Sequence, residues 1–200
     1  LNGFLKVNSV NEESFGNKAG EENSYLSNND IRLELIETDE MPYQISDLGS
    51  GSDKFLGGDE FDLVTSGGGA DYISLGKGDD IAVLEGATLS TDKNPFDGKS
   101  NFSIVDTGTG SDTVEISTDF EGSVKLISGG GADTIVINSD SGAFSWGAGT
   151  GAGAKDLILT SSDASIILSN QMAHEDNLVF SYIEFVSIDP ITGQETSEIF

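Results

Sequence analysis

Apolar side chains recur at a fixed interval in one part of this chain. Phe55, Val64 and Ile73 are nine residues apart, and Ala82 takes the next position. Polar and glycine-rich residues separate them, which is typical of short strands joined by turns. The pattern therefore predicts a repeating stack of short strands between residues 48 and 83.

A longer apolar period follows this block. Residues 112–119, 133–140 and 156–163 each read as Asp, a short apolar strand, a polar pair and Asp, and Asp176 begins a weaker fourth copy. Each intervening stretch contains a second apolar segment, at 124–127, 144–146 and 166–168. We interpret these segments as wider coils that continue the first stack.

Aspartate and glycine occupy fixed columns of the nine-residue repeat. The aspartates are Asp53, Asp62, Asp71 and Asp80; one glycine column holds Gly49, Gly58, Gly67 and Gly76, and the other holds Gly51, Gly69 and Gly78, with Glu60 interrupting it. Self-similarity at a fixed short period is the signature of a repeat architecture. Ordinary Gly-Asp turns in a β-sandwich are the plainer alternative.

This pattern resembles the RTX nonapeptide, GGxGxDxUx with U a large apolar residue. The resemblance implies an all-β parallel β-roll or β-helix solenoid, in which two nonapeptides form a coil of 18 residues. Turns 18 residues apart would then stack about 4.8 Å apart. Asp53 would lie above Asp71, and Asp62 above Asp80.

Calcium suits such a stack, because Ca²⁺ takes about 6 to 8 oxygen ligands from carboxylates and carbonyls. We expect several ions, held by the aspartates and glycines of the columns. Asp112 and Asp133 follow similar glycine-rich turns and are predicted to join them. Asp156 follows Ala152 and Ala154 instead of glycines, and the segment before Asp176 has no glycine, so both are weaker candidates.

Other aspartates have two open interpretations. Asp47 and Asp106 begin the pattern Asp-x-Gly-x-Gly-x-Asp and are candidate extra ligands. Asp119, Asp140 and Asp163 could form a second ladder, or they could cap turns through local hydrogen bonds.

We expect a single domain with five parts. Segment 1–46 would cap one end of the stack, 47–84 is the nonapeptide block, 85–101 is an insertion loop, 102–176 holds the wider coils, and 177–200 is a C-terminal strand and tail. Capping is expected of both flanks because solenoid ends expose core and unpaired edges. The insertion is either a solvated loop or part of a binding face.

Charge excludes some partners. With 9 Lys+Arg and 35 Asp+Glu, the net charge is −26, which argues against nucleic acid and anionic membranes. Hydrophobic residues make up 36% of the chain, which favours a packed interior, and the chain has no cysteine for a disulfide. No apolar run could span a bilayer. Because residues 1–10 do not read as a signal peptide, we expect a segment of a larger protein.

Catalytic motifs are few. There is no GxSxG elbow, the single histidine, His174, lies in a polar stretch, and the glycine-rich run 147–153 lacks a P-loop lysine. We therefore expect no enzyme, although carboxylate pairs keep glycan chemistry as a third alternative.

RTX segments belong to calcium-dependent proteins exported by type I secretion, so the resemblance implies a secreted or cell-surface location. In size, acidity and mixture of repeats, the chain is similar to the peptide-binding domain of giant RTX adhesins. That implies a monomeric adhesion module that binds peptides or C-termini of host cell-surface proteins through calcium. The predicted ligand-contacting residues are Tyr72, Asp92, Asn94, Asp97 and Trp146. The alternative is a purely structural calcium-folded segment.

Overall fold

The computed structural model describes residues 43–89, 91–172, 179–189 and 191–200. Most of the predicted capping segment 1–46, together with Asp176 and His174, lies outside the described residues. The described part is nearly all β, which confirms the all-β expectation. Among the described residues, no helix is long and apolar enough to cross a membrane.

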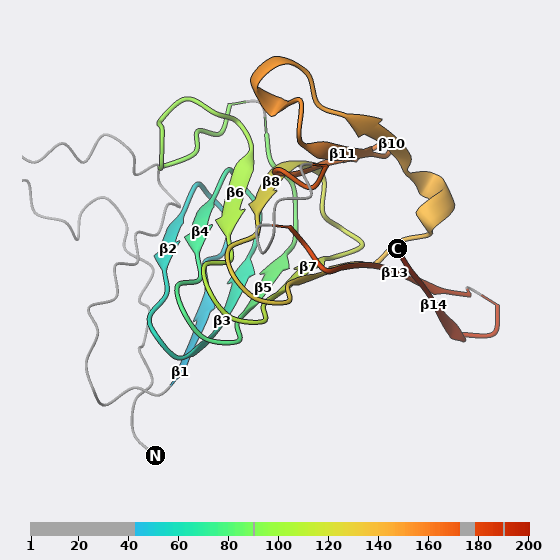
Figure 1. The fold of residues 1–200 in the computed structure, drawn as a ribbon, viewed down its shortest axis with the longest axis horizontal. Helices are drawn as coiled ribbons and strands as arrows, with labels where there is room; N and C mark the ends of the chain where they lie inside the picture. The colour runs from blue at the N-terminus through green and yellow to red at the C-terminus, as the bar shows by residue number, and fades with distance from the viewer. Residues whose placement is uncertain (1–42, 90, 173–178, 190) are drawn as a thin grey trace, which may run out of the picture.

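The described residues form fourteen strands and two short 3₁₀ helices (Figure 1). The strands are β1 (Tyr43–Asp47), β2 (Lys54–Leu56), β3 (Phe61–Ser66), β4 (Tyr72–Ser74), β5 (Ile81–Leu84), β6 (Ser103–Asp106), β7 (Thr113–Ile116), β8 (Gly122–Ile127), β9 (Thr134–Ile137), β10 (Ser145–Ala148), β11 (Leu157–Thr160), β12 (Ala164–Leu168), β13 (Tyr182–Ile188) and β14 (Glu195–Ile199). The helices are η1 (Ser141–Ala143) and η2 (Gly151–Gly153).

These strands form two mixed sheets that face each other. Sheet 1 has the order β1-β3-β5-β7-β9-β13-β14, and sheet 2 has the order β10-β11-β12-β8-β6-β4-β2. From β1 to β9, successive strands go alternately to sheet 1 and sheet 2, and the neighbours within each sheet are parallel. Each turn between strands therefore carries the chain from one sheet to the other (Figure 1).

The register of the strands reproduces the sequence periods. Tyr43 pairs with Phe61, 18 residues later, and Lys54 pairs with Tyr72 at the same separation. Across the insertion the separation is 32, from Tyr72 to Ile104. Thr113 then pairs with Thr134, a separation of 21. Every turn thus lies against the turn one coil earlier, despite the changing coil length.

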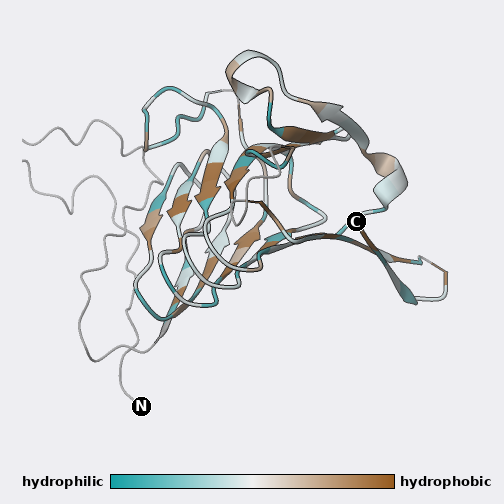
Figure 2. Cartoon of the chain, viewed as in Figure 1, coloured by the Kyte–Doolittle hydropathy of each residue, from teal (hydrophilic) through white to brown (hydrophobic). Residues whose placement is uncertain are grey.

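The apolar column of the repeat forms the core between the sheets. Phe55 and Ile73 from sheet 2 and Val64 and Ala82 from sheet 1 are completely buried. Their strand neighbours point outward, because side chains alternate between the faces of a strand. Hydrophobic residues accordingly concentrate on the strands, and hydrophilic residues on many of the turns (Figure 2).

The C-terminal coils depart from the predicted arrangement. Strand β11, which follows Asp156, lies in sheet 2 and pairs antiparallel with β10 and β12. The place beside β9 in sheet 1 is taken by β13. The prediction that segment 156–163 repeats segments 112–119 and 133–140 is therefore wrong. Strand β14 then folds back antiparallel on β13.

Substitutions that shorten a side chain should destabilise the protein more on the buried face of a strand than on its outer face. Ile135→Ala deletes a completely buried side chain in β9, and it is expected to lower the free energy of unfolding by about 2–5 kcal/mol. Val136→Ala, on the outer face of the same strand, should cost less than about 1 kcal/mol. Chemical denaturation measures both, and equal losses would contradict this assignment of faces.

Candidate metal centre

Four aspartates stack along the edge where the chain passes from sheet 2 to sheet 1. They are Asp62, Asp80, Asp112 and Asp133, each at most 1% exposed. Each backbone N–H donates to Oδ1 of the next aspartate: Asp62 to Asp80 at 2.7 Å, Asp80 to Asp112 at 2.8 Å and Asp112 to Asp133 at 3.1 Å. The nonapeptide block and the wider coils therefore share one carboxylate ladder.

A shorter ladder occupies the opposite edge. The backbone N–H of Asp53 donates to Oδ1 of Asp71 at 2.8 Å, and both residues are completely buried. The N–H of Asp71 donates to the hydroxyl oxygen of Ser103 at 3.1 Å. The insertion lengthens the next turn on this edge, and Ser103 takes the position where a third carboxylate would lie.

The glycine columns are explained by the close approach of successive turns. A Cβ added to Gly69 would lie 1.5 Å from the carbonyl oxygen of Gly51, and one added to Gly110 would lie 1.5 Å from that of Gly78. Gly129 and Gly131 have equally close carbonyl neighbours one coil earlier. Only glycine leaves room for a carbonyl that points into the gap between turns.

Carbonyl and carboxylate oxygens converge in these gaps. A Cβ on Gly78 would lie 2.7 Å from the carbonyl oxygen of Glu60 and 3.0 Å from Oδ1 of Asp80. A Cβ on Gly110 would likewise lie 3.3 Å from Oδ1 of Asp112. Each gap is thus lined by oxygen atoms from two turns.

The Oδ2 atoms of the ladder aspartates differ in whether they accept a hydrogen bond. Oδ2 of Asp71 accepts the hydroxyl of Ser66, and Oδ2 of Asp133 accepts the hydroxyls of Ser128 at 2.5 Å and Thr107 at 3.0 Å. Oδ2 of Asp62 accepts the N–H of Gly58 at 2.9 Å. Asp80 and Asp112 differ from these residues.

Oδ2 of Asp80 and Oδ2 of Asp112 are buried and have no hydrogen-bond partner among the described residues. Burial above all, together with neighbouring carboxylates, raises the pKa of each carboxyl from 3.8 to about 7, against the lowering effect of the backbone hydrogen bond that each accepts. Burial also raises the pKa of Asp62. A buried oxygen without a partner is costly, and a buried negative charge is more costly still.

This arrangement suits a hard cation such as Ca²⁺. The donors are carboxylate and carbonyl oxygens, with no thiolate or imidazole in the ladders. Among residues 43–89, 91–172, 179–189 and 191–200, no group of three or more His, Cys, Asp or Glu side chains could hold a metal ion. A cation between two turns would therefore need backbone carbonyls in addition to the carboxylates.

Two other predicted calcium ligands accept hydrogen bonds from backbone N–H groups of their own turns. Oδ1 of Asp47 accepts the N–H of Gly49 at 3.1 Å, and Oδ1 of Asp106 accepts the N–H of Gly108 at 3.2 Å. These bonds, between residues two apart, form Asx turns, so they supply turn geometry on opposite edges of the stack.

The remaining aspartates also bind locally. Asp140 caps η1 by accepting the N–H of Gly142 at 2.8 Å, and Asp163 accepts the Ser162 hydroxyl at 2.6 Å. Both contacts fit the capping interpretation, and Asp119 is exposed. Asp156 accepts the N–H of Asn170 at 3.0 Å and precedes β11, which places it outside the ladder. Ala152 and Ala154 explain this departure, because a Cβ in the glycine columns would collide with the turn below.

The predicted ligand-contacting residues do not form one site. Tyr72 lies in β4 and stacks on Phe96 of the insertion, with ring centroids 4.8 Å apart. Trp146 lies in β10, five strand positions away in sheet 2, or about 24 Å at the usual strand spacing. It contacts Phe185 and Phe200 instead.

The insertion is closed by its own polar residues. Asn94 is completely buried, and its amide donates to the carbonyls of Asp71 at 2.7 Å and Phe102 at 3.0 Å. Asp92 accepts the N–H of Leu89 at 2.6 Å. Asp97 accepts two N–H groups and the Ser100 hydroxyl, and this hydrogen bonding lowers its pKa. Asn94 therefore anchors the loop to the stack.

Reasoning from the sequence missed the hydroxyl partners of the ladders. Ser66 and Ser128 each stand five residues before an aspartate, and this spacing was visible in the sequence. Ser103, by contrast, reaches its position only because the insertion returns to the stack. The continuity of Asp80 with Asp112 could have been found by counting strands, since one strand of each sheet, β5 and β6, lies between them.

A methyl group in a glycine column should disrupt the stack. Gly110→Ala places a Cβ on the Gly78 carbonyl at a φ of +142°, and it is expected to lower the free energy of unfolding by about 2 kcal/mol or more. Gly147→Ala is the matched control, because nothing lies within 4 Å of its Cβ. Thermal unfolding measures both, and equal melting temperatures would contradict the close approach of turns.

In the absence of divalent cations, stability should depend on pH through Asp80 and Asp112. Their folded pKa of about 7 lies above the unfolded value of 3.8. Their stabilising contribution is therefore complete below pH 3.8 and is lost as the pH rises through about 7. Denaturation in chelator should show a lower free energy of unfolding at pH 8 than at pH 5. Asp112→Asn should flatten this difference, and a wild-type profile in the variant would exclude Asp112 as the source.

Comparison of the chain with protein-family models, with curated proteins and with solved structures found no match. The resemblance to RTX repeats therefore rests on the columns of aspartate and glycine in this sequence.

Proposed function

We propose that this chain is a calcium-binding RTX-like β-roll, a parallel solenoid stapled by calcium, which serves as a binding module of a secreted or cell-surface protein. The strand alternation from β1 to β9, the parallel pairing and the 18-residue register support the β-roll. The buried oxygen-lined gaps support calcium.

One observation carries the calcium assignment. Asp80 and Asp112 are adjacent in the ladder, each is 1% exposed, and each has a buried Oδ2 without a hydrogen-bond partner. Elsewhere in the ladder, a hydroxyl or an N–H satisfies the corresponding oxygen of Asp62 and Asp133. In the Asp80–Asp112 gap, by contrast, no described group donates a hydrogen bond to either Oδ2.

Bound calcium would supply the positive charge that lets both carboxylates ionise inside the stack. The chain's own residues would supply the ligand oxygens and hold them in place. Asp80 and Asp112 provide oxygens, the glycines keep the gap open for carbonyls, and the backbone N–H of each aspartate fixes the orientation of the next carboxylate. Ions that bind only the folded state stabilise it, by about 2.7 kcal/mol per site at 100 times the dissociation constant.

Because the ladder carboxylates are buried, an ion between them can stabilise the fold but cannot contact a ligand at the surface. Carboxylates that are at most 1% exposed cannot present an ion to a partner's carboxylate at the surface. We therefore assign the ladder ions to folding. Capture of a host peptide or protein C-terminus, the adhesion role expected from the RTX resemblance, would need a separate surface. A purely structural β-roll remains the alternative, and nothing in the ladders favours glycan hydrolysis.

Calcium titration followed by far-UV circular dichroism tests the proposal. We expect calcium to increase β structure and to raise the melting temperature, and excess chelator to reverse both effects. Magnesium should be much less effective, because it demands a tight octahedral geometry. A spectrum and melting temperature unaffected by calcium and chelator would overturn the proposal.

A pair of matched variants tests whether calcium binds in the Asp80–Asp112 gap. Asp112→Asn keeps the Oδ1 acceptor for Asp80 but removes a buried charge, so it should weaken calcium binding by about tenfold or more. Asp119→Asn removes the same charge from an exposed turn and should leave the affinity within about twofold. Isothermal titration measures both. Equal affinities would exclude the Asp80–Asp112 gap as a site.

A further inference from the structure

The C-terminal end of the fold has a sheet edge that no described strand covers. Strand β14 is the last strand of sheet 1. Residues Ile183 and Phe200 exchange both backbone hydrogen bonds, and Asp189 donates to Gln194 in the same register. Since hydrogen-bonded pairs alternate in an antiparallel ladder, the backbone groups of Glu195, Ser197 and Ile199 point away from β13.

This edge lacks the usual protection against pairing. Strand β14 contains no proline, lysine or glycine, and all five of its residues are exposed. Its outward N–H and C=O groups therefore form an open template for another strand.

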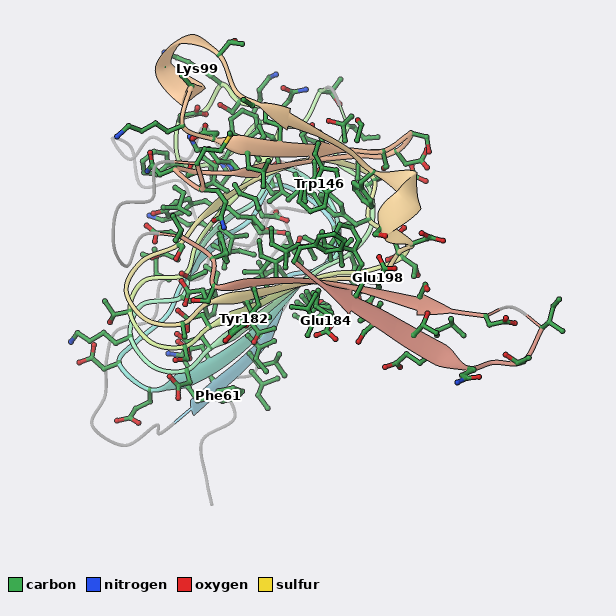
Figure 3. All side chains as sticks on the ribbon, turned by 45° about the vertical axis from the view of Figure 1, so that its right-hand side comes forward. Phe61, Lys99, Trp146, Tyr182, Glu184 and Glu198 are labelled. Carbon is green, nitrogen blue, oxygen red and sulfur yellow. The ribbon has the colours of Figure 1, made fainter. Side chains whose placement is uncertain are left out.

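Aromatic side chains lie beside this edge. Phe200 follows β14 and is 57% exposed, and Trp146 of β10 is 42% exposed. Their ring centroids are 5.2 Å apart, and both contact the buried ring of Phe185. Core residues from both sheets thus reach the surface here, and Figure 3 shows Trp146 on β10 and Glu198 on the β13–β14 ribbon. Partly exposed aromatics of this kind suit an apolar contact with a partner.

The charge around this edge has one sign. Glu184, Glu195 and Glu198 lie on the ribbon, and Asp140 and Asp189 line a groove of about 840 Å³ together with Glu195. After Lys155, the sequence contains no lysine or arginine. A second copy would bring the same carboxylates together, which is unfavourable, whereas a basic segment would neutralise them.

We propose that the free edge of β14 binds an extended basic peptide segment as an additional strand, with Trp146 and Phe200 contacting its apolar side chains. Main-chain hydrogen bonds to Glu195, Ser197 and Ile199 hold the strand, and the carboxylates select lysine or arginine at alternate positions. This names a ligand class and a surface for the binding module, and it rests on the proposed function only for that role. The edge itself contains none of the ladder aspartates.

The test uses the whole chain with calcium and a labelled, acetylated peptide that alternates lysine with valine and phenylalanine. Fluorescence anisotropy measures binding. We expect this peptide to bind at least about tenfold more tightly than a matched peptide with glutamate in place of lysine, and to weaken with added salt. N-methylation of alternate peptide bonds should abolish binding. Equal affinity for the lysine and glutamate peptides would overturn the proposal.

Protein variants locate the site. Ser197→Pro removes an outward N–H without touching a bond to β13, and it should weaken binding by about tenfold or more. Ser197→Ala keeps that N–H and should bind within about twofold of the wild type. Trp146→Ala should also weaken binding. The proposal would be overturned if Ser197→Pro bound the peptide as tightly as the wild type does while its circular dichroism responded to calcium in the same way. It would also be overturned if the wild-type chain associated with itself and Ser197→Pro blocked that association.

The two proposals fail separately. Peptide binding without any effect of calcium on circular dichroism would refute calcium-dependent folding and leave the β14 site standing. Calcium-dependent folding without selective binding of the lysine peptide would refute the β14 site and leave the folding proposal standing.

Discussion

Stacked carboxylates buried between successive turns are the constraint on which the rest of this structure depends. Asp62, Asp80, Asp112 and Asp133 lie one above another, each with its Oδ1 or N–H engaged by a neighbour. Like charges at such spacing repel and burial strengthens the repulsion, so the ladder is tolerable only if protons or cations neutralise it. Glycines, hydroxyls and the closeness of the turns all follow from the need to satisfy these oxygens.

Hydroxyl groups and unpaired oxygens divide the ladders into two kinds of position. Asp133 receives hydroxyl hydrogen bonds from Ser128 and Thr107, which stabilise its carboxylate without any ion. Asp80 and Asp112 have no such donors for Oδ2 and carry the raised pKa values. Dependence on calcium would therefore be concentrated in one gap of the stack. Neighbouring gaps would be partly ordered by hydrogen bonds alone.

The ends of the sheets have a different chemistry from the middle. In the middle, parallel coils bury the core and leave alternate side chains outside. At the C-terminal end, β10 and β11 are antiparallel, as are β13 and β14 (Figure 1). Trp146 and Phe200 are exposed there. A regular stack supplies rigidity, and its irregular end supplies unpaired backbone and aromatic surface. Folding and recognition can therefore occupy different parts of one small domain.

The nine-residue period was enough to predict the all-β class and the pairing of Asp53 with Asp71 and of Asp62 with Asp80. This was possible because a strict period fixes which residues meet in successive turns. The sequence also predicted strands near 124–127 and 166–168, which the structure contains as β8 and β12. It did not determine the partners of the strands that follow 140. Two alanines in the glycine columns make the turn before Asp156 too bulky to stack, and the chain turns back as β10 and β11 instead.

Long-range contacts set which oxygens lack partners and which residues share a surface. Tyr72 and Trp146 look alike in the sequence, yet five strand positions separate them, because long-range pairing and not local pattern sets their distance. The insertion likewise reads as a loose loop, but the buried amide of Asn94 ties it to the backbone of Asp71. Such contacts depend on where the chain returns to the stack, and no local period encodes that.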